Sequence, residues 1–453
     1  MKYFFLLCLL PVFSIAQKTE KWLTVTDGSV LFEKQNFKGE FANAEDTNLP
    51  TVFVNPERRF QTMDGFGFTL TGGSAMLIDQ LTPKARKDLL QHLFGNEEQD
   101  VSINFLRLSV GASDLDDHVF SYQESEKAPF SLAEDENHLI PVLKDILKIQ
   151  PKLKLMASPW SPPAWMKTNN DSKGGSLKTE YFAAYAQYLI TYLKEMQKRG
   201  IEIEYLTIQN EPLHPGNNPS LLMQAYDQAK FIRENLGPAL AKTSLKTKLL
   251  VYDHNADRPD YPLTIYADKE ASKYVYGAAF HLYGGRTQAI GDVRDAYPDK
   301  ALFFTEQWIG APGNLKGDLA WHVENLMMDA VKNGCQTVLQ WNLAADANQE
   351  PHTPGGCTGC LGALTIDGQN ISKNPAYYIV AHASKIVPAG SIRIASNETM
   401  SLRTVAYLRP DGKIAVLILN TADKPIDFQI RIGDKVLKDT LLGAGYGSYL
   451  VGF

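Results

Sequence analysis

The chain has 453 residues, with 45 basic and 51 acidic side chains and a formal net charge of −6 at pH 7. Its composition is that of an ordinary globular protein, since 44% of the residues are hydrophobic and 21% are charged. No block of lysines and arginines provides the positive patch that nucleic acid or an anionic membrane surface requires, so we exclude both as partners.

The first residues are typical of a cleavable export signal. A basic start and the apolar run Tyr3–Val12 precede small residues at Ser14 and Ala16. This pattern predicts a signal peptide over 1–16, cleaved after Ala16, because about ten apolar residues are too few to cross a bilayer. A buried N-terminal element and a lipoprotein signal on Cys8 are the alternatives. No later run approaches 18 apolar residues. We therefore expect a secreted or periplasmic protein without a transmembrane anchor.

Residues 17–60 are expected to form strands. Trp22–Phe32 alternates apolar and polar residues around Asp27-Gly28, which predicts a strand, a turn and a second strand. We assign 17–60 to the N-terminal strands of a β-sandwich.

Residues 61–386 alternate short β-rich runs with longer helical stretches. Eight such units favour a (β/α)8 barrel, an α/β fold, over a doubly wound sheet, which usually has fewer strands and a dinucleotide-binding fingerprint that is missing here. The predicted strands are Gly65–Thr69, Asn104–Val110, Lys152–Ala157, Glu204–Gln209, Lys248–Tyr252, Gly277–His281, Ala301–Thr305 and Thr337–Trp341. The predicted helices include Pro83–Leu93, Asn137–Ile149, Thr179–Arg199, Pro219–Leu236, Leu319–Lys332 and Ala376–Ile386.

Two long loops follow the third and the eighth predicted strands, at Ser158–Thr179 and Asn342–Pro375. Such loops lie at the C-terminal face of a barrel, where ligands bind. The second loop contains Cys357 and Cys360, which could form a local disulfide in an oxidising compartment or remain free thiols. We expect no metal there, because a closed zinc site needs four ligands and no second Cys pair exists.

Residues 387–453 are expected to complete the sandwich from the other end of the chain. Four stretches alternate around turns such as Pro410-Asp411-Gly412 and contain no helical pattern. They are Thr404–Leu408, Ile414–Leu419, Ile426–Ile432 and Gly447–Val451.

Two acidic residues stand at the ends of predicted barrel strands, where the active groups of this fold lie. Glu211 follows the fourth strand and Glu306 follows the seventh. Glycoside hydrolysis requires such a pair, because one carboxyl protonates the leaving oxygen while the other meets the oxocarbenium-like centre. A separation of about 5–5.5 Å between them gives retention of configuration.

Other strand ends carry groups that suit a neutral polyol, whose ring faces are apolar and whose edges need hydrogen bonds. Asn210 stands beside Glu211, where its amide is suited to the sugar 2-hydroxyl. The remaining candidates are Asp114, Trp160, His281, Tyr283 and Trp341. Each alone also has a structural interpretation, as barrel-top core, as a satisfied histidine or as a turn acceptor.

Several segments together resemble glycoside hydrolase family 30, which includes glucosylceramidases and microbial β-1,6-glucanases. They are Asp64-Gly65-Phe66-Gly67, Leu106-Arg107-Leu108-Ser109, Ala157-Ser158-Pro159-Trp160-Ser161-Pro162-Pro163-Ala164-Trp165-Met166-Lys167, Gln209-Asn210-Glu211-Pro212, Thr305-Glu306 and Trp341-Asn342-Leu343-Ala344. The resemblance implies a (β/α)8 barrel with a β-sandwich made from both chain ends.

The resemblance also implies roles for the candidate residues. Glu211 would be the acid/base, with a raised pKa, and Glu306 the ionised nucleophile that forms a covalent glucosyl-enzyme. Asp114, Trp160 and Asn210 would bind the glucosyl unit in the −1 subsite. Trp341 would lie beside it, with His281 and Tyr283 near the nucleophile. The implied mechanism uses no metal and no organic cofactor.

The chain departs from the animal glucosylceramidase pattern after the eighth strand. Residues Pro351–Cys360 look more like the microbial β-1,6-glucanase branch, which favours β-1,6-glucan or a related β-glucoside as substrate. Glucosylceramide, a glycolipid, and a different glycone such as xylose or fucose are alternatives. An inactive carbohydrate-binding barrel is a further alternative from another class. The sequence gives no oligomeric state.

Overall fold

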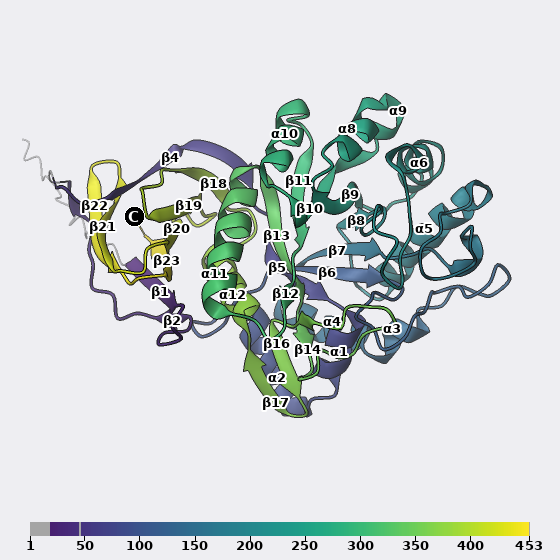
Figure 1. Cartoon of the computed structure of the whole chain (residues 1–453), viewed down its shortest axis with the longest axis horizontal. Coiled ribbons are helices and arrows are strands. Elements are labelled where there is room, and N and C mark those ends of the chain that lie inside the picture. Colours follow the sequence, from purple (N-terminus) through teal and green to yellow (C-terminus); the bar gives the residue numbers. More distant parts are fainter. Residues whose placement is uncertain (1–18, 45–46, 453) are drawn as a thin grey trace, which may run out of the picture.

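A closed barrel and a β-sandwich lie side by side in the computed structural model, which describes residues 19–44 and 47–452 (Figure 1). The predicted signal peptide over 1–16 lies outside the described residues. All eight predicted barrel strands are present, in the closed order β10-β11-β13-β5-β6-β7-β8-β9. They are β5 (Gly65–Leu70), β6 (Phe105–Val110), β7 (Lys154–Pro159), β8 (Tyr205–Thr207), β9 (Lys248–Ala256), β10 (Val275–Gly285), β11 (Ala301–Glu306) and β13 (Cys335–Asn342).

Side chains alternate along these strands and divide the barrel interior into two layers. In β6, Leu106 and Leu108 pack outward with the helices, whereas Phe105 belongs to an apolar cluster inside the barrel. Met156, Tyr205 and other residues of that cluster fill the lower interior. Because side chains two residues apart share a face, the next inward positions form a polar layer above it. This layer is the floor of the site described below.

Helices cover the outside of the barrel. The main ones are α1 (Gly72–Asp79), α2 (Pro83–Phe94), α3 (Ala133–Asn137), α4 (Leu139–Ile149), α5 (Phe182–Lys198), α6 (Ala225–Phe231), α7 (Gly237–Ala241), α8 (Asp260–Ala267), α9 (Lys269–Ser272), α10 (Gln288–Ala296), α11 (Leu315–His322) and α12 (Pro375–Ile386). Short 3-10 turns occur at η1 (Ala164–Met166) and η2 (Thr179–Tyr181), and π-helical turns at η3 (Ile232–Leu236) and η4 (Val323–Ala330).

The helix expected over Asn137–Ile149 is present as α4 but begins two residues later, because the backbone of His138 leaves the helical region and separates α4 from α3. One helix prediction needs a larger correction. The helix expected from Pro219 begins only at Ala225, because the preceding backbone is engaged elsewhere. In that segment Ser220 N donates to Ser172 O, and Met223 N donates to Pro212 O.

The sandwich consists of a ten-stranded sheet in the order β2-β1-β23-β20-β19-β18-β4-β21-β22-β3, so it takes strands from both chain ends as predicted. The long strand β4 joins its halves, since Thr51–Val54 pairs with β21 and Val54–Thr62 pairs with β18. Both halves contribute to one apolar core. The strands are β1 (Thr19–Val25), β2 (Glu33–Lys34), β3 (Ala42–Asn43), β4 (Thr51–Thr62), β18 (Ile392–Ser396), β19 (Leu402–Leu408), β20 (Ile414–Asn420), β21 (Ile426–Ile432), β22 (Lys435–Leu441) and β23 (Gly445–Val451).

The N-terminal hairpin differs from the prediction. The first strand and the turn at Asp27-Gly28 are present, but the partner strand β2 begins at Glu33. The expected second strand is bent away because Asp27 accepts from both the backbone and the hydroxyl of Ser29. Phe32 then adopts φ 52° and packs edge-on against His382 of α12. The Phe32 side chain therefore packs between the sandwich and the barrel.

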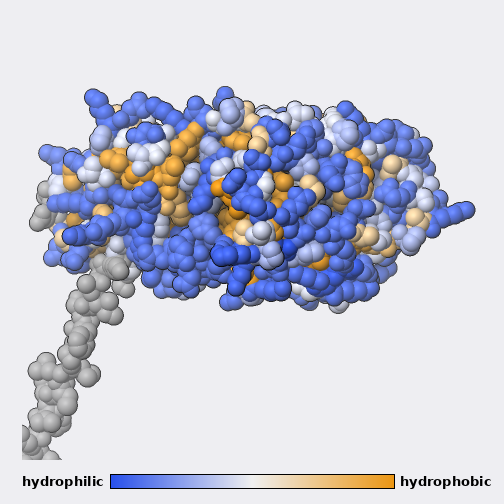
Figure 2. Space-filling model, turned by 90° about the horizontal axis from the view of Figure 1, so that it is seen from below, coloured by the Kyte–Doolittle hydropathy of each residue, from blue (hydrophilic) through white to orange (hydrophobic). Residues whose placement is uncertain are grey.

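Two small sheets lie in the loops at the barrel mouth. One pairs β12 (Ile309–Gly310) with β15 (Cys360–Leu361). The other contains β14 (Ala344–Ala345), β16 (Leu364–Asp367) and β17 (Asn370–Lys373). Among the described residues no helix has the length and apolarity needed to cross a bilayer. The face seen in Figure 2 is mainly hydrophilic, with hydrophobic patches between the polar regions.

Candidate active site

Arg107 is the centre of the polar layer that lies above the apolar barrel interior. It comes from β6 and is fully buried. Its Nη1 donates to Glu306 Oε2 over 2.7 Å, and its Nη2 donates to Asn210 Oδ1 over 2.7 Å and to Asp253 Oδ2 over 2.8 Å. One cation therefore orients side chains from the ends of three other strands.

Asp253 is the second hub of this layer and is also fully buried. Besides Arg107, it accepts hydrogen bonds from Ser158, Thr207 and Thr305 and contacts His281 Nε2 at 3.1 Å. Burial opposes ionisation of this carboxyl, but the charge of Arg107 and the hydrogen bonds hold its pKa far below the usual range. Asp253 is therefore a fixed anion beneath the site.

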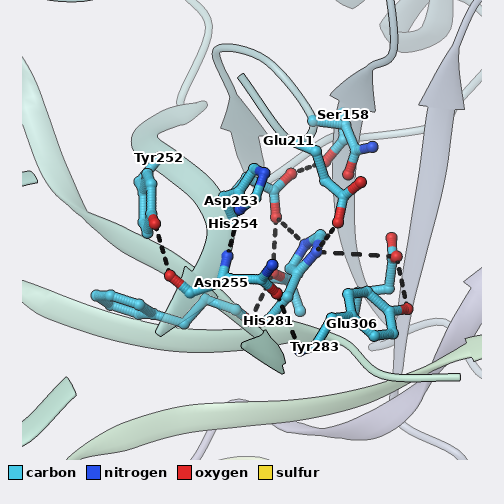
Figure 3. Close-up of polar contacts among 12 residues, drawn as sticks. Ser158, Glu211, Tyr252, Asp253, His254, Asn255, His281, Tyr283 and Glu306 are labelled. Carbon is cyan, nitrogen blue, oxygen red and sulfur yellow. Dashed lines mark hydrogen bonds and ion pairs between the residues drawn. The ribbon is translucent and has the colours of Figure 1, made fainter. Parts of the chain in front are cut away.

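The two predicted catalytic carboxyls meet above this layer. Glu211 Oε1 lies 3.1 Å from His281 Nδ1, while Glu306 Oε1 lies 3.8 Å from the same nitrogen and accepts from the Tyr283 hydroxyl over 2.9 Å. In Figure 3 both carboxyl groups point toward the His281 ring. One carboxylate oxygen of Glu211, one of Glu306 and a ring nitrogen of His281 lie within 4.8 Å of one another. The two carboxyl groups therefore lie close together, both beside the His281 ring.

The backbone is strained where it presents these groups. Glu211 has φ 45° and Asp253 has φ 60°, in the left-handed region that non-glycine residues rarely adopt. Glu211 N donates to Asp253 O over 3.0 Å, so the two strained positions support each other. Strain of this kind clusters at functional sites.

The protonation order of the free site differs from the expected one. Burial favours neutral Glu211, but the hydrogen bond and positive charge of His281 outweigh it and lower the pKa of this carboxyl. The pKa of Glu306 is raised, because the effect of burial exceeds the lowering effect of the positive charges of His281 and Arg107. Burial alone would lower the pKa of His281. The surrounding carboxyl groups of Glu306, Asp253 and Glu211 outweigh this effect and raise the pKa to about 9. The acidic proton of the free site therefore lies on His281, next to Glu211.

The carboxyl pair opens into a cavity of about 580 Å³. Among the predicted site residues, those that line it are Asp114, Glu211, Tyr283, Glu306, Trp341, Cys357 and Cys360. Burial, together with the charges of Glu306 and Glu211, raises the pKa of Asp114 to about 7. A larger cavity of about 680 Å³ lies at the opposite end of the barrel. Its charged lining includes Lys154, Glu204 and Lys248 but neither catalytic candidate, so we place the site at the carboxyl pair.

Trp160, Asn210 and His281 lie at the site but not in the lining of the cavity. Trp160 is 2% exposed and stacks on Trp341 with ring centroids 5.4 Å apart. The guanidinium of Arg107 lies 4.7 Å from the Trp160 ring centre. Asn210 is bound through its oxygen to Arg107. In the free protein these three side chains support the residues that line the cavity.

Residues 351–361, which we call the strap, border the cavity. Cys357 and Cys360 form the local disulfide that the sequence allowed, and Cys335 is a free, buried thiol. One end of the strap is held by Thr353 N, which donates to Asp114 O over 3.0 Å. At the other end β15 pairs with β12, directly after Glu306. The strap therefore crosses the barrel mouth from the end of β6 to the end of β11.

The cluster of Glu211, His281 and Glu306 has a spacing that could hold a metal ion. Both oxygens of Glu306 already accept hydrogen bonds, one from Arg107 and one from Tyr283. His281 is also engaged through both of its ring nitrogens. These contacts favour a hydrogen-bonded acid pair at this place.

Sequence reasoning did not identify Arg107 and Asp253 as site residues, although they organise the site. The signal for Asp253 was present, since it directly follows the predicted strand Lys248–Tyr252, as Glu306 follows its own strand. Arg107 lies inside a strand between two leucines. A charged residue at an inward strand position is rarely buried without an acidic partner, which could have indicated its role.

Comparison with known proteins identifies the family of this fold and site. Residues 63–387 match the glycosyl hydrolase family 30 TIM-barrel domain, and residues 390–445 match the β-sandwich domain of the same family. An endo-1,6-β-D-glucanase of Aspergillus fumigatus is 31% identical over 411 residues, covering 83% of this chain and 82% of that protein. The lysosomal acid glucosylceramidase of Mus musculus is 29% identical over 428 residues, covering 88% of this chain and 82% of that protein.

A solved structure agrees with these matches. The endo-β-1,6-glucanase BT3312 superposes with a TM-score of 0.88 at 30% sequence identity, covering 95% of this chain and 98% of that one. The match extends over both the barrel and the sandwich. The chain therefore belongs to glycosyl hydrolase family 30, and it is an O-glycosyl hydrolase.

Proposed function

We propose that the protein cleaves β-1,6-glucan or a related β-glucoside with retention of configuration, through a covalent intermediate on Glu306. The observation that carries this proposal is that carboxylate oxygens of Glu211 and Glu306 and a ring nitrogen of His281 lie within 4.8 Å of one another at the barrel mouth. A close approach of the two carboxyls favours retention, because the carboxyls of inverting enzymes stand about 6.5–9.5 Å apart to leave room for a water molecule.

The contacts of the two carboxyls favour Glu306 as the nucleophile. A carboxylate that accepts from a guanidinium and a phenol is held in one orientation, and these contacts favour its anion against the burial that raises its pKa. Its free electron pair would attack the anomeric carbon while the bond to the leaving oxygen breaks. Water would then displace Glu306 from that carbon, and Glu211 would take the proton of the water.

Glu211 would supply the proton that the leaving oxygen requires. Its hydrogen bond with His281 holds that proton, which in the free site lies on the imidazole nitrogen. Movement along this 3.1 Å contact turns the charged pair into neutral Glu211 and neutral His281. Asp253 accepts from the other ring nitrogen at 3.1 Å and so fixes the tautomer needed for the transfer.

Two carboxamide variants test these roles. Glu306→Gln should remove nearly all turnover while sugar binding stays measurable by calorimetry. Glu211→Gln should lose activity on substrates with poor leaving groups but keep much of it on activated aryl glucosides, which need no proton. Equal loss of aryl glucoside activity in both variants would contradict the assignment.

The substrate proposal is supported by the endo-1,6-β-glucanases among the similar proteins. The test is product release from equal amounts of β-1,6-glucan and glucosylceramide, with Glu306→Gln as the blank. Gluco-oligosaccharides from the glucan alone support the proposal. Ceramide release would place the protein with the glucosylceramidases, to which it is also similar. Release from neither substrate would favour another glycone or a binding role.

We also propose that the protein is exported, with cleavage after Ala16. The support is the basic start, apolar run and small-residue exit of the first residues. N-terminal sequencing of protein recovered from outside the cytoplasm should begin at Gln17. An intact Met1 terminus on protein from that fraction would contradict cleavage.

A further inference from the structure

Trp308 is an exposed aromatic residue at the edge of the cavity, two positions after Glu306. It is 37% exposed, whereas Trp160 and Trp341 at the same site are almost fully buried. It lines the cavity together with Glu211, Glu306 and Tyr283. An accessible tryptophan ring beside a carboxyl pair is a surface on which an apolar sugar face can stack.

The strap supports this ring. A side-chain carbon at Gly310 would lie 3.4 Å from the Trp308 ring, and one at Gly359 would lie 3.8 Å from it. The ring therefore lies close to the backbone of the β12–β15 pair and of the turn before it. Ala311 N donates to Gly359 O over 2.9 Å, and the disulfide closes the turn that contains Gly359. The ring thus has a backing that is fixed by hydrogen bonds and a covalent link.

The polar groups of the cavity wall suit a hydroxylated ligand better than an alkyl chain. His214, Asn217, His254 and Asn255 line the cavity beyond the carboxyl pair. Burial lowers the pKa of His254 to about 4, so its ring is neutral. Its Nδ1 accepts from Asn255 N over 2.7 Å, and its buried Nε2 has no hydrogen-bond partner among the residues that the structure describes. Neutral donors and acceptors around one exposed ring are typical of carbohydrate subsites.

The cavity has room for more than the reacting sugar. Its volume of about 580 Å³ falls in the range that encloses a ligand of drug size. Trp341 and Asp114 line the same cavity as the carboxyl pair, where the proposed function places the reacting sugar. Resting on the proposed function, we infer that Trp308 is the stacking platform for a second sugar unit next to the one at the carboxyl pair, and that the strap holds this platform in place.

The experiment compares substrates with one and two sugar units. Glucosyl fluoride has only the reacting sugar, gentiobiose adds a second unit that leaves, and gentiobiosyl fluoride adds a second unit that is retained. In Trp308→Ala, kcat/KM for at least one two-sugar substrate should fall about tenfold or more relative to that for glucosyl fluoride. Trp308→Phe should recover part of this ratio, because a phenyl ring retains a stacking face.

Two further variants separate the platform from general damage. Trp321→Ala removes a comparably exposed tryptophan, 39% exposed, from α11 outside the cavity, and should leave the ratios unchanged. A Cys357→Ser, Cys360→Ser double variant should lower the same ratio as Trp308→Ala, since the backing of the ring is loosened. Equal loss on all three substrates in Trp308→Ala, or loss on none, would overturn the inference. Inactivity of the wild type on β-1,6-glucan and on all three of these substrates would instead refute the proposed function.

Discussion

The guanidinium of Arg107 contacts the Glu306 carboxylate at 2.7 Å, where the two side chains are 0% and 7% exposed. The same guanidinium binds Asp253, which is also fully buried. Removal of this buried cation alone should destabilise the fold, because it leaves the two buried carboxylates without a compensating positive charge.

Replacement of Arg107 by Met should therefore destabilise the protein by about 3–5 kcal/mol. The measurement is the free energy of unfolding from urea titration. Arg258→Met is the matched control, because Arg258 also pairs with an aspartate but is 54% exposed, so that its loss should cost less than about 1 kcal/mol. Similar losses in both variants would show that the buried network contributes little.

The Tyr283 hydroxyl should matter for turnover more than for stability. It donates to Glu306 Oε1 over 2.9 Å, and Tyr283 is 39% exposed. Tyr283→Phe should lower kcat/KM on an aryl β-glucoside by about 10–100-fold, the value of one hydrogen bond to a charged group. Tyr226→Phe, at a residue 79% exposed and outside the cavity, should have no effect. Unchanged kinetics in Tyr283→Phe would argue against Glu306 as the nucleophile.

Asp135 should make stability depend on pH. It is buried and accepts from the Tyr122 hydroxyl over 2.7 Å, and burial raises its pKa from 3.8 to about 8. Its folded pKa exceeds the unfolded one, so its stabilising contribution is complete below the unfolded value and is lost as pH rises toward about 8. The asparagine side chain in Asp135→Asn is uncharged at every pH.

The difference in unfolding free energy between wild type and Asp135→Asn should therefore change in favour of the variant between about pH 4 and pH 8, by up to about 1.4 kcal/mol per pH unit. Asp171→Asn should give no such slope, because the pKa of the exposed Asp171 is lowered by hydrogen bonds to the Lys173 backbone and to Ser172. A flat difference for Asp135→Asn would mean that this carboxyl is ionised in the folded protein.

Thiol titration checks the cysteine assignments. Burial raises the pKa of the Cys335 thiol, so the native protein should react with no thiol reagent. After denaturation, protein cleaved after Ala16 should expose the single thiol of Cys335, and reduction should add those of Cys357 and Cys360. Free thiols at Cys357 and Cys360 without reductant would contradict the disulfide.

The barrel was predictable because its signals are local. Each strand, such as Ala301–Glu306, is a short buried run followed by a helical pattern, and side-chain alternation alone determines which residues point inward. The same rule located Glu211 and Glu306, since carboxyl ends of parallel strands meet at one face. The sandwich strands β4, β18 and β22 were not predicted. Much of β4 is exposed, and β18 and β22 are short strands with few fully buried positions.

The features that could not be predicted from the sequence depend on contacts between residues that are distant in the chain. The proton order of Glu211 and Glu306 follows from where His281 lies between them, which no sequence spacing contains. The packing site of Phe32 after this bend is the ring of His382, about 350 residues later in the chain. The importance of Arg107 likewise became visible only when its partners from three other strands were in place.

The pairing of β1 with β23, in which Thr19 is opposite Val451, has a consequence for how the protein is made. The ribosome releases β23 only after the barrel has been synthesised, so β1 must wait for its partner while the whole barrel emerges between them. We expect the barrel to gain structure first on the growing chain. Until then the edge of β1 that pairs with β23 can form hydrogen bonds with strands of other chains. A chaperone that binds short apolar strands would protect this segment during translation.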